Sequence, residues 1–297
     1  MGWFGTLLLA KPTTATLPTQ PGVREAFGSS FATPGPWGNK LGLYDLGQGW
    51  QRVGVAPFCT ERLRLSAGVD GLVAATAAPA LAAYVSNSDC AQLEGRTATG
   101  LSFSLHLPNT NEPCGYEHVE GRPEPVDTHL AVDALRTWAV EAGRTPSTEA
   151  ITALLTWDDE GFPVMEDAVL GLFAGLGFTP EAEILPVINP DDPAFGDFER
   201  VVRMADVRAS GEQYMASRGW PLEDDLRATP EDLDYLRFRD LLWSSVYGGG
   251  ATRDELVAQY EQLTARWKNE RRPGGDRPRP APAVVSMEEA VTVVQPW

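Results

Sequence analysis

The chain has 297 residues, of which 43% are hydrophobic and 22% are charged. This composition excludes a disordered chain or a fibre, and the length suits one large domain or two ordinary ones. No apolar run approaches the ~18 residues that a membrane-spanning helix needs. The sequence therefore predicts a folded protein with a sizeable core and no membrane partner.

The negative charge is concentrated in the middle of the chain. The formal net charge is −17, and residues 121–240 hold 10 basic and 25 acidic side chains, a net charge of −15. Such a field repels nucleic-acid phosphates and attracts a basic protein surface. We therefore expect no nucleic-acid partner. The alternative interpretation of the carboxylates is a solvated surface that keeps the protein soluble.

The cysteines indicate a reducing compartment. Cys59, Cys90 and Cys114 are an odd and sparse set, which is not a disulfide framework. The first ten residues lack the basic stretch and the long apolar run of a signal peptide. We therefore expect a cytoplasmic protein.

The first 120 residues predict a β-rich region with one or two helices. Residues 101–107 alternate leucine and Phe103 with Ser102, Ser104 and His106, which indicates a strand with one buried face and one wet face. Gly47-Gln48-Gly49 lies between two short apolar runs and predicts a hairpin. The expected strands are 4–10, 41–46, 50–55, 80–85, 90–94 and 101–107, and the expected helices are 23–27 and 69–78.

After a bridge rich in Pro and Glu at 108–125, the apolar spacing becomes helical. Helix-start signals occur at Thr229-Pro230-Glu231-Asp232 and at Thr252-Arg253-Asp254-Glu255, on either side of Gly248-Gly249-Gly250, and they predict an antiparallel helix pair. The expected helices are 127–142, 147–157, 164–176, one set from Asp197, 229–247 and one from Thr252.

These elements predict an α+β fold, in which a β-rich N-terminal region precedes a helical middle and a C-terminal helical hairpin. The expected organisation is an α+β domain at 1–177, a Pro-rich linker or long loop at 178–196, a helical domain at 197–270, and a flexible Pro-rich spacer with an apolar tail at 271–297.

Three weak signals for chemistry compete with ordinary structural roles. Cys114, His118 and His129 resemble a zinc ligand set, with Cys90 or Cys59 as a fourth ligand, although the usual C-x2-C and H-x3-H pairs are absent. Cys90 with His106 or His118 as a base is a candidate nucleophile, but a cysteine on a strand is more often a small buried hydrophobe. Residues 156–167 resemble a calcium loop without its first Asp and its final Glu. We therefore predict no cofactor.

Three stretches of the first half also resemble an uncharacterised bacterial protein family over about the first 175 residues. They are the opening Met1-Gly2-Trp3-Phe4-Gly5, the hairpin at Gly49-Trp50, and Ala83-Tyr84-Val85-Ser86-Asn87-Ser88-Asp89-Cys90-Ala91. No activity is known for that family, so the resemblance implies no catalytic residue.

The acidic segment and the lack of an active-site motif predict a non-enzymatic protein of the immunity or antitoxin type that binds a basic partner. One alternative is a hydrolase that uses Cys90 or a metal site of Cys114, His118 and His129. A second is a structural subunit that docks by its C-terminal tail. The expected contact residues are Asp158, Asp159, Glu160, Glu166, Asp167, Trp220, Glu223, Asp224, Asp225 and Trp297.

Overall fold

The computed structural model divides into two compact units. Unit 1 contains the described residues up to Leu185, and unit 2 contains those from Pro186 onward. This boundary lies within the segment 178–196. The structure describes residues 2–28, 30–31, 41–56, 63–110, 114–115, 118, 120–156, 164–190, 192–221 and 227–270.

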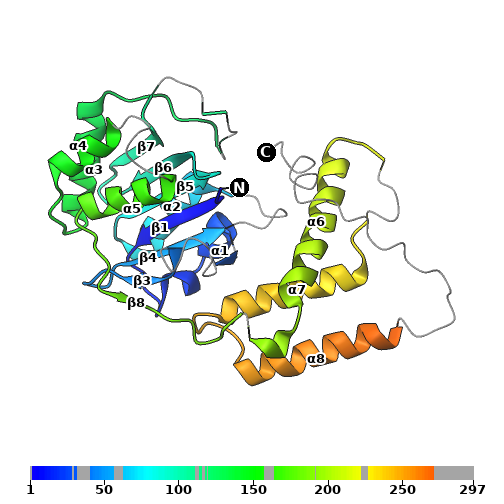
Figure 1. Cartoon of the computed structure of the whole chain (residues 1–297). Coiled ribbons are helices and arrows are strands. Elements are labelled where there is room, and N and C mark those ends of the chain that lie inside the picture. The colour runs from blue at the N-terminus through cyan, green and yellow to red at the C-terminus, as the bar shows by residue number, and fades with distance from the viewer. Residues whose placement is uncertain are drawn as a thin grey trace. The chain divides into compact units, whose positions relative to one another are not determined.

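Unit 1 is built on one antiparallel sheet, with β1 between β4 and β5 (Figure 1). β3 pairs with β4, so the predicted hairpin is confirmed, and β8 adds an unpredicted edge strand beside β3. The order is β7 (Ser102–Leu107), β6 (Cys90–Arg96), β5 (Ala80–Ser86), β1 (Gly5–Ala10), β4 (Gln51–Ala56), β3 (Tyr44–Asp45) and β8 (Ala182–Glu183), while β2 (Ser30–Phe31) also pairs with β4.

One face of this sheet is apolar and is covered by three helices. Leu7, Leu81, Leu93 and Leu105 come from neighbouring strands and share one core cluster with the helices. Trp138 is at the centre of this core, fully buried, and its ring meets Trp50 and Phe178 within 6 Å between centroids. Its indole N–H donates to the carbonyls of Ala80 and Arg96. The three helices are α3 (Thr128–Glu141), α4 (Thr148–Leu155) and α5 (Met165–Gly175).

The opposite face is packed partly by helices and partly by polar side chains. α2 (Leu65–Thr76) packs on β5 and β6 and on α1 (Val23–Phe27), which follows the short helix η1 (Leu17–Thr19). Farther along the face, Gln92, Glu94 and His106 are buried. The prediction of a wet face on β7 is therefore wrong for His106. The reason is that the chain after β7 returns to this face, where Glu120 accepts hydrogen bonds from Ser66 at the start of α2.

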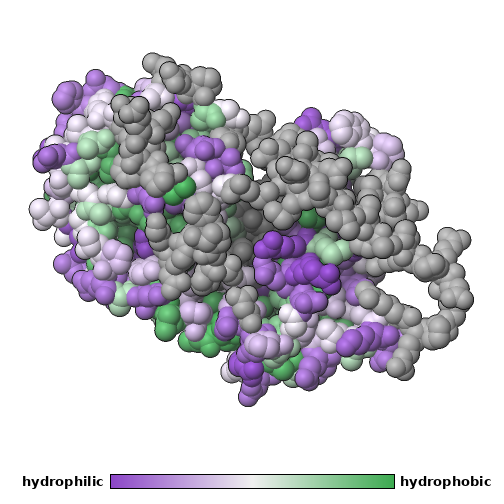
Figure 2. All heavy atoms as spheres, in the orientation of Figure 1, coloured by the Kyte–Doolittle hydropathy of each residue, from purple (hydrophilic) through white to green (hydrophobic). Residues whose placement is uncertain are grey.

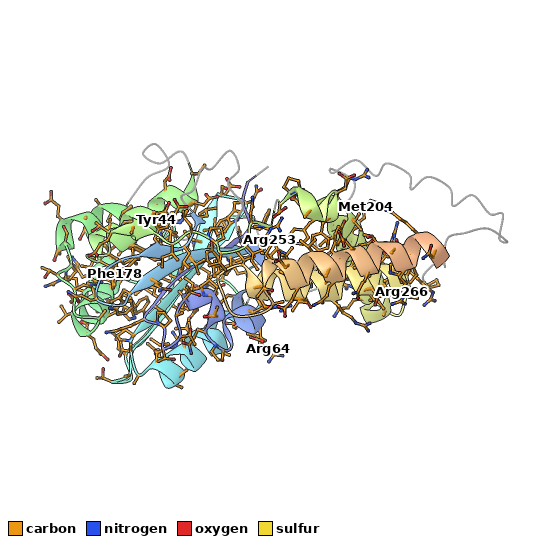
Figure 3. All side chains as sticks on the ribbon, turned by 90° about the horizontal axis from the view of Figure 1, so that it is seen from below. Tyr44, Arg64, Phe178, Met204, Arg253 and Arg266 are labelled. Carbon is orange, nitrogen blue, oxygen red and sulfur yellow. The ribbon has the colours of Figure 1, made fainter. Side chains whose placement is uncertain are left out.

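Unit 2 is helical, as the sequence predicts. α6 (Phe198–Ser217), α7 (Pro230–Ser245) and α8 (Arg253–Glu270) follow the short helix η3 (Pro193–Phe195) and enclose one aromatic core. In that core the rings of Phe195, Phe198 and Tyr260 lie 5.6–5.9 Å apart where they meet. Arg266 of α8, labelled in Figure 3, forms a salt bridge with Asp234 of α7 at 2.8 Å, which joins the two helices of the predicted pair.

The start of α7 offers a direct test of unit 2. The predicted N-cap Thr229 and the acid Asp232 form a capping box, in which each side chain bonds the other's backbone N–H. We expect Thr229→Ala to lower the free energy of unfolding of unit 2 by about 1 kcal/mol. The reason is that the backbone N–H of Asp232 loses the Thr229 hydroxyl that accepts from it. Thr229→Ser keeps the hydroxyl and should retain most of the stability. Hydrogen exchange of α7 peptides measures the difference, and equal exchange in the two variants would contradict it.

Candidate metal centre

Four metal-ligating side chains meet on the polar face of β6 and β7. Cys90, His106, Cys114 and His118 each offer one ligand atom, and these atoms all lie within 4.8 Å of one another. Cys90 begins β6 and His106 is near the end of β7. Because the two strands are antiparallel and His106 is opposite Gln92, Cys90 and His106 become diagonal neighbours on one face. Cys114 and His118 come from the connection that follows β7.

The ligand atoms are spaced within about 1 Å of the distances in a tetrahedral zinc site. Zinc binds sulfur at ~2.3 Å and nitrogen at ~2.0 Å, so its ligand atoms lie about 3.3–3.8 Å apart. In the structure, Cys114 Sγ and His118 Nε2 are 3.1 Å apart. The rings of His106 and His118 meet edge to face with centroids 4.9 Å apart. Two thiols and two imidazoles are also a donor set that zinc prefers.

The histidines have ring nitrogens available for an ion. His106 Nδ1 lies 2.7 Å from the carbonyl oxygen of Pro108. If Nδ1 carries the proton and donates to this carbonyl, the lone pair is on Nε2, which is the usual second-shell arrangement of a metal-bound histidine. Within the described residues, His106 Nε2 is buried and has no hydrogen-bond partner. His118 would bind through Nε2, the atom that contacts Cys114 Sγ. A buried nitrogen without a partner is costly, and a metal ion would satisfy it.

The protonation states also suit a metal site. Burial lowers the pKa of His106 to about 4 and also lowers that of His118, with a smaller contribution from the positive charge of Arg122. Both imidazoles are therefore neutral at pH 7, as metal ligands must be. Burial is the main cause that raises the pKa of the Cys90 thiol. Without a metal this thiol stays protonated, which does not favour the alternative of Cys90 as a nucleophile.

The connection that carries Cys114 and His118 is fastened to the rest of unit 1 at several points. Asn109 exchanges two hydrogen bonds with the backbone of Val126. Arg122 donates to the carbonyl of Thr110 at 2.6 Å, and Glu120 accepts from Ser66. These contacts hold the two ends of the connection, while the candidate ligands are between them.

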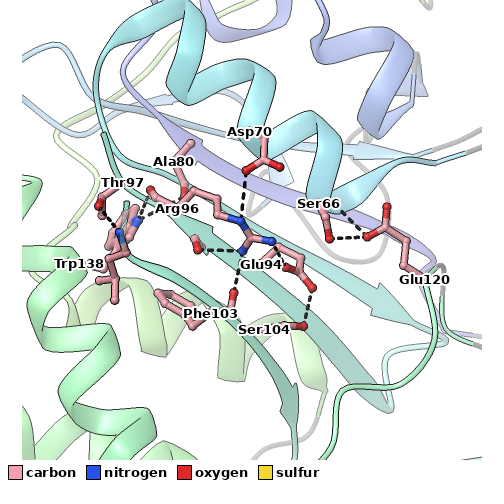
Figure 4. A network of polar contacts seen from close by, with 12 residues as sticks. Ser66, Asp70, Ala80, Glu94, Arg96, Thr97, Phe103, Ser104, Glu120 and Trp138 are labelled. Carbon is pink, nitrogen blue, oxygen red and sulfur yellow. Dashed lines mark hydrogen bonds and ion pairs between the residues drawn. The ribbon is translucent and has the colours of Figure 1, made fainter. Parts of the chain in front are cut away.

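A second polar network lies on the same face of β6, and it is satisfied internally (Figure 4). Arg96 pairs with Glu94 at 3.0 Å and with Asp70 of α2 at 3.2 Å, and it donates to the carbonyls of Gly95 and Phe103. Ser104 donates to Glu94 from the neighbouring strand. Since the charge of Arg96 is paired with Glu94 and Asp70, this network fixes α2 to the sheet.

The structure brings together three of the residues that the sequence nominated for zinc. Cys114, His118 and Cys90 are in the cluster, but His129 is not. His129 is exposed at the start of α3, where its backbone N–H donates to Asp127. The prediction of His129 as a ligand is therefore wrong, because the start of α3 holds this residue outside the cluster. His106 takes the place of His129. The other predicted fourth ligand, Cys59, lies outside the described residues.

The predicted partner-binding residues are mostly outside the described ranges, as is most of the calcium-like loop. Glu166 is only 3% exposed, and its carboxylate accepts a hydrogen bond from Ser88 at 2.6 Å. Burial raises the pKa of Glu166, so this residue does not fit the predicted surface role. Asp167 is partly exposed, and Trp220 is 54% exposed. The residues outside the described ranges are Asp158, Asp159, Glu160, Glu223, Asp224, Asp225 and Trp297.

Compared with known protein families, curated proteins and solved structures, the chain gives no match. In the part of the chain that the structure describes, no helix combines the length and the apolar character needed to cross a membrane.

Proposed function

We propose that this chain is a zinc-binding protein in which Cys90, His106, Cys114 and His118 hold one Zn²⁺ ion. The observation that carries the proposal is the convergence of these four side chains from two strands and a connection. The buried, unpartnered Nε2 of His106 supports it, because nothing else among the described residues satisfies that atom. A reducing compartment such as the cytoplasm would keep both cysteines as thiols.

A structural role fits this ligand set better than a catalytic one. Structural zinc sites use four protein ligands, whereas catalytic sites keep one position for water or substrate. Cys90 and His106 are fully buried, which leaves little room for a substrate beside them. Two thiolates would also neutralise the charge of the ion. The ion would join the connection after β7 to the sheet, and the hydrolase alternative is correspondingly less favoured.

Zinc analysis of four proteins tests the proposal. We expect the parent chain to hold one zinc per molecule after exchange into metal-free buffer. His106→Ala and Cys114→Ser should bind zinc at least tenfold more weakly, because each removes one of four ligands. His129→Ala is the matched control, since His129 is exposed on α3, and it should bind like the parent. Full zinc retention by His106→Ala, or its loss from His129→Ala, would refute the assignment. Absorption of the Co²⁺ form provides an independent readout of thiolate ligation.

A basic protein partner is a second candidate function. Trp220 is exposed after α6, its ring lies 6.1 Å from that of Tyr214, and it precedes the acidic residues 223–225 in the sequence. Exposed tryptophans are frequent contact residues in protein interfaces. On the visible surface, hydrophilic side chains lie on both units rather than in one patch (Figure 2). Support for a basic partner therefore comes from the region around Trp220 alone.

The partner proposal is tested with a charge variant. We expect the parent chain to capture a basic protein from an extract of its source at low salt and to release it at about 0.5 M salt, where charges are screened within a few ångströms. The variant Glu223→Gln/Asp224→Asn/Asp225→Asn should not capture it. Equal capture by the parent and the variant would show that these carboxylates are not the contact.

A further inference from the structure

The two cysteines of the candidate zinc site differ in their access to solvent. Cys90 is fully buried on β6, whereas Cys114 is partly exposed on the connection after β7. Their sulfur atoms lie within 4.8 Å of each other, and both residues are thiols rather than halves of a disulfide. Cys114 is therefore the cysteine that a dissolved reagent can approach. Cys90 can react only with a group that is already inside the site.

We propose that Cys114 and Cys90 form a peroxide-sensitive pair, in which oxidation to a disulfide releases the zinc ion. Cys114 is the sulfur that meets the peroxide, and Cys90 is the sulfur that resolves the product. This inference rests on the proposed zinc-binding function, and it adds a modification site and a class of reactant, the hydroperoxides.

The reaction balances with the peroxide as the only oxidant. The Cys114 thiolate attacks one peroxide oxygen, the O–O bond breaks, and the departing oxygen takes a proton and leaves as water or an alcohol. Cys114 is then a sulfenic acid. In the zinc-loaded chain Cys90 is held as a thiolate. Its sulfur attacks the Cys114 sulfur, the S–S bond forms, and hydroxide leaves and takes a second proton. Two electrons pass from the two sulfurs to the peroxide.

The geometry favours a disulfide over further oxidation of Cys114. A disulfide needs its sulfurs ~2.05 Å apart, so the pair has to close a gap that is at most 4.8 Å. Cys114 can make this movement because it is outside the strands. The next residue, Gly115, has a φ of 78°, and no atom of the described residues lies within 4 Å of the position a Cβ would take there. Cys90 is held in β6, so the movement falls on the connection. Once both sulfurs are joined, only His106 and His118 remain as ligands, and two imidazoles hold zinc far more weakly than the full set.

The test uses the zinc-loaded full chain with Cys59→Ser, so that the pair can be followed alone. Zinc is quantified before oxidation, hydrogen peroxide is added, and released zinc is followed with a chromogenic chelator. Peptide mapping without reduction identifies the cysteine products. We expect about one zinc released per chain together with a Cys90–Cys114 disulfide. Dithiothreitol followed by added zinc should restore the original zinc content.

The variant Cys90→Ser separates the two sulfur roles. It leaves Cys114 without a resolving sulfur, so we expect a sulfenic acid that a dione reagent traps, followed by sulfinic acid that dithiothreitol does not reverse. This readout does not require the variant to retain zinc. Trapping at Cys90 in the Cys114→Ser variant, at a rate equal to that of Cys114, would overturn the assigned order.

The failures of the two proposals are distinguishable. If the chain holds no zinc before oxidation, the zinc function is overturned. If the Cys90–Cys114 disulfide still forms in that chain, the pairing of the two thiols stands but zinc release does not. A chain that holds one zinc and keeps it while peroxide is consumed overturns the oxidation proposal and leaves the zinc function intact. Zinc release with sulfinic acid and no disulfide also overturns the pairing of Cys90 with Cys114.

Discussion

A free zinc concentration a thousand times the dissociation constant is expected to raise the free energy of unfolding of unit 1 by about 4 kcal/mol. The reason is that the four ligands come together only in the folded unit, since Cys90 and His106 are on different strands and Cys114 and His118 are on the connection. An ion that binds the folded state alone stabilises it by mass action. Hydrogen exchange of peptides from β6 and β7 measures this gain within unit 1.

Two variants make this first expectation specific. In His106→Ala the zinc-dependent gain at the same zinc concentration should fall by about 1.4 kcal/mol or more, because zinc binds at least tenfold more weakly. The variant is also less stable without zinc because it loses a buried side chain. In His129→Ala the gain should equal that of the parent. A gain of the same size in α7 peptides, which belong to unit 2, would show that zinc acts elsewhere. Protection of β6 and β7 that does not change with zinc would contradict a structural ion.

The second large effect is expected at Trp138. We expect Trp138→Ala to lower the free energy of unfolding of unit 1 by about 3–5 kcal/mol, because it removes a fully buried ring and leaves a cavity beside Trp50 and Phe178. The substitution also leaves the carbonyls of Ala80 and Arg96 without the indole donor. Denaturant unfolding followed by exchange of β1 and β5 peptides measures this loss.

Graded substitutions separate packing from hydrogen bonding at this position. Trp138→Phe keeps an aromatic ring but removes the N–H donor, and we expect it to cost about 1–3 kcal/mol. Leu130→Ala on the same helix is the control, because Leu130 is 64% exposed and should cost less than about 0.5 kcal/mol. Equal losses for Leu130→Ala and Trp138→Ala would mean that the core of unit 1 is not organised around Trp138.

The regular elements could be predicted from local patterns. The run of alternating residues before His106 became β7, and Thr229 with Asp232 marked the start of α7 because capping depends on residues close in sequence. The edge strand β8 could not be predicted in this way. It has two residues in a Pro-rich stretch, and its strand character comes from pairing with β3, which is more than a hundred residues away.

The site was predictable only in part, for the same physical reason. Cys114 and His118 are four residues apart, so the sequence itself shows that they are neighbours. Cys90 joins them through the β6–β7 register, which the sequence does not reveal. The sequence indicates His106 only as a base for Cys90, because its place on an alternating strand predicts a wet face. Its burial follows from the returning connection, and that is a tertiary contact.

The central position of β1 has a consequence for synthesis of the protein. Of the described strands β1 is made first, and all six of its residues are buried. Its partners β4 and β5 follow later in the chain, since Gly5 pairs with Val85. Long loops must close before such pairs form, which slows folding. An apolar segment that waits for its partners is a site for aggregation and for chaperones. The nascent chain is therefore most vulnerable between emergence of β1 and completion of β5.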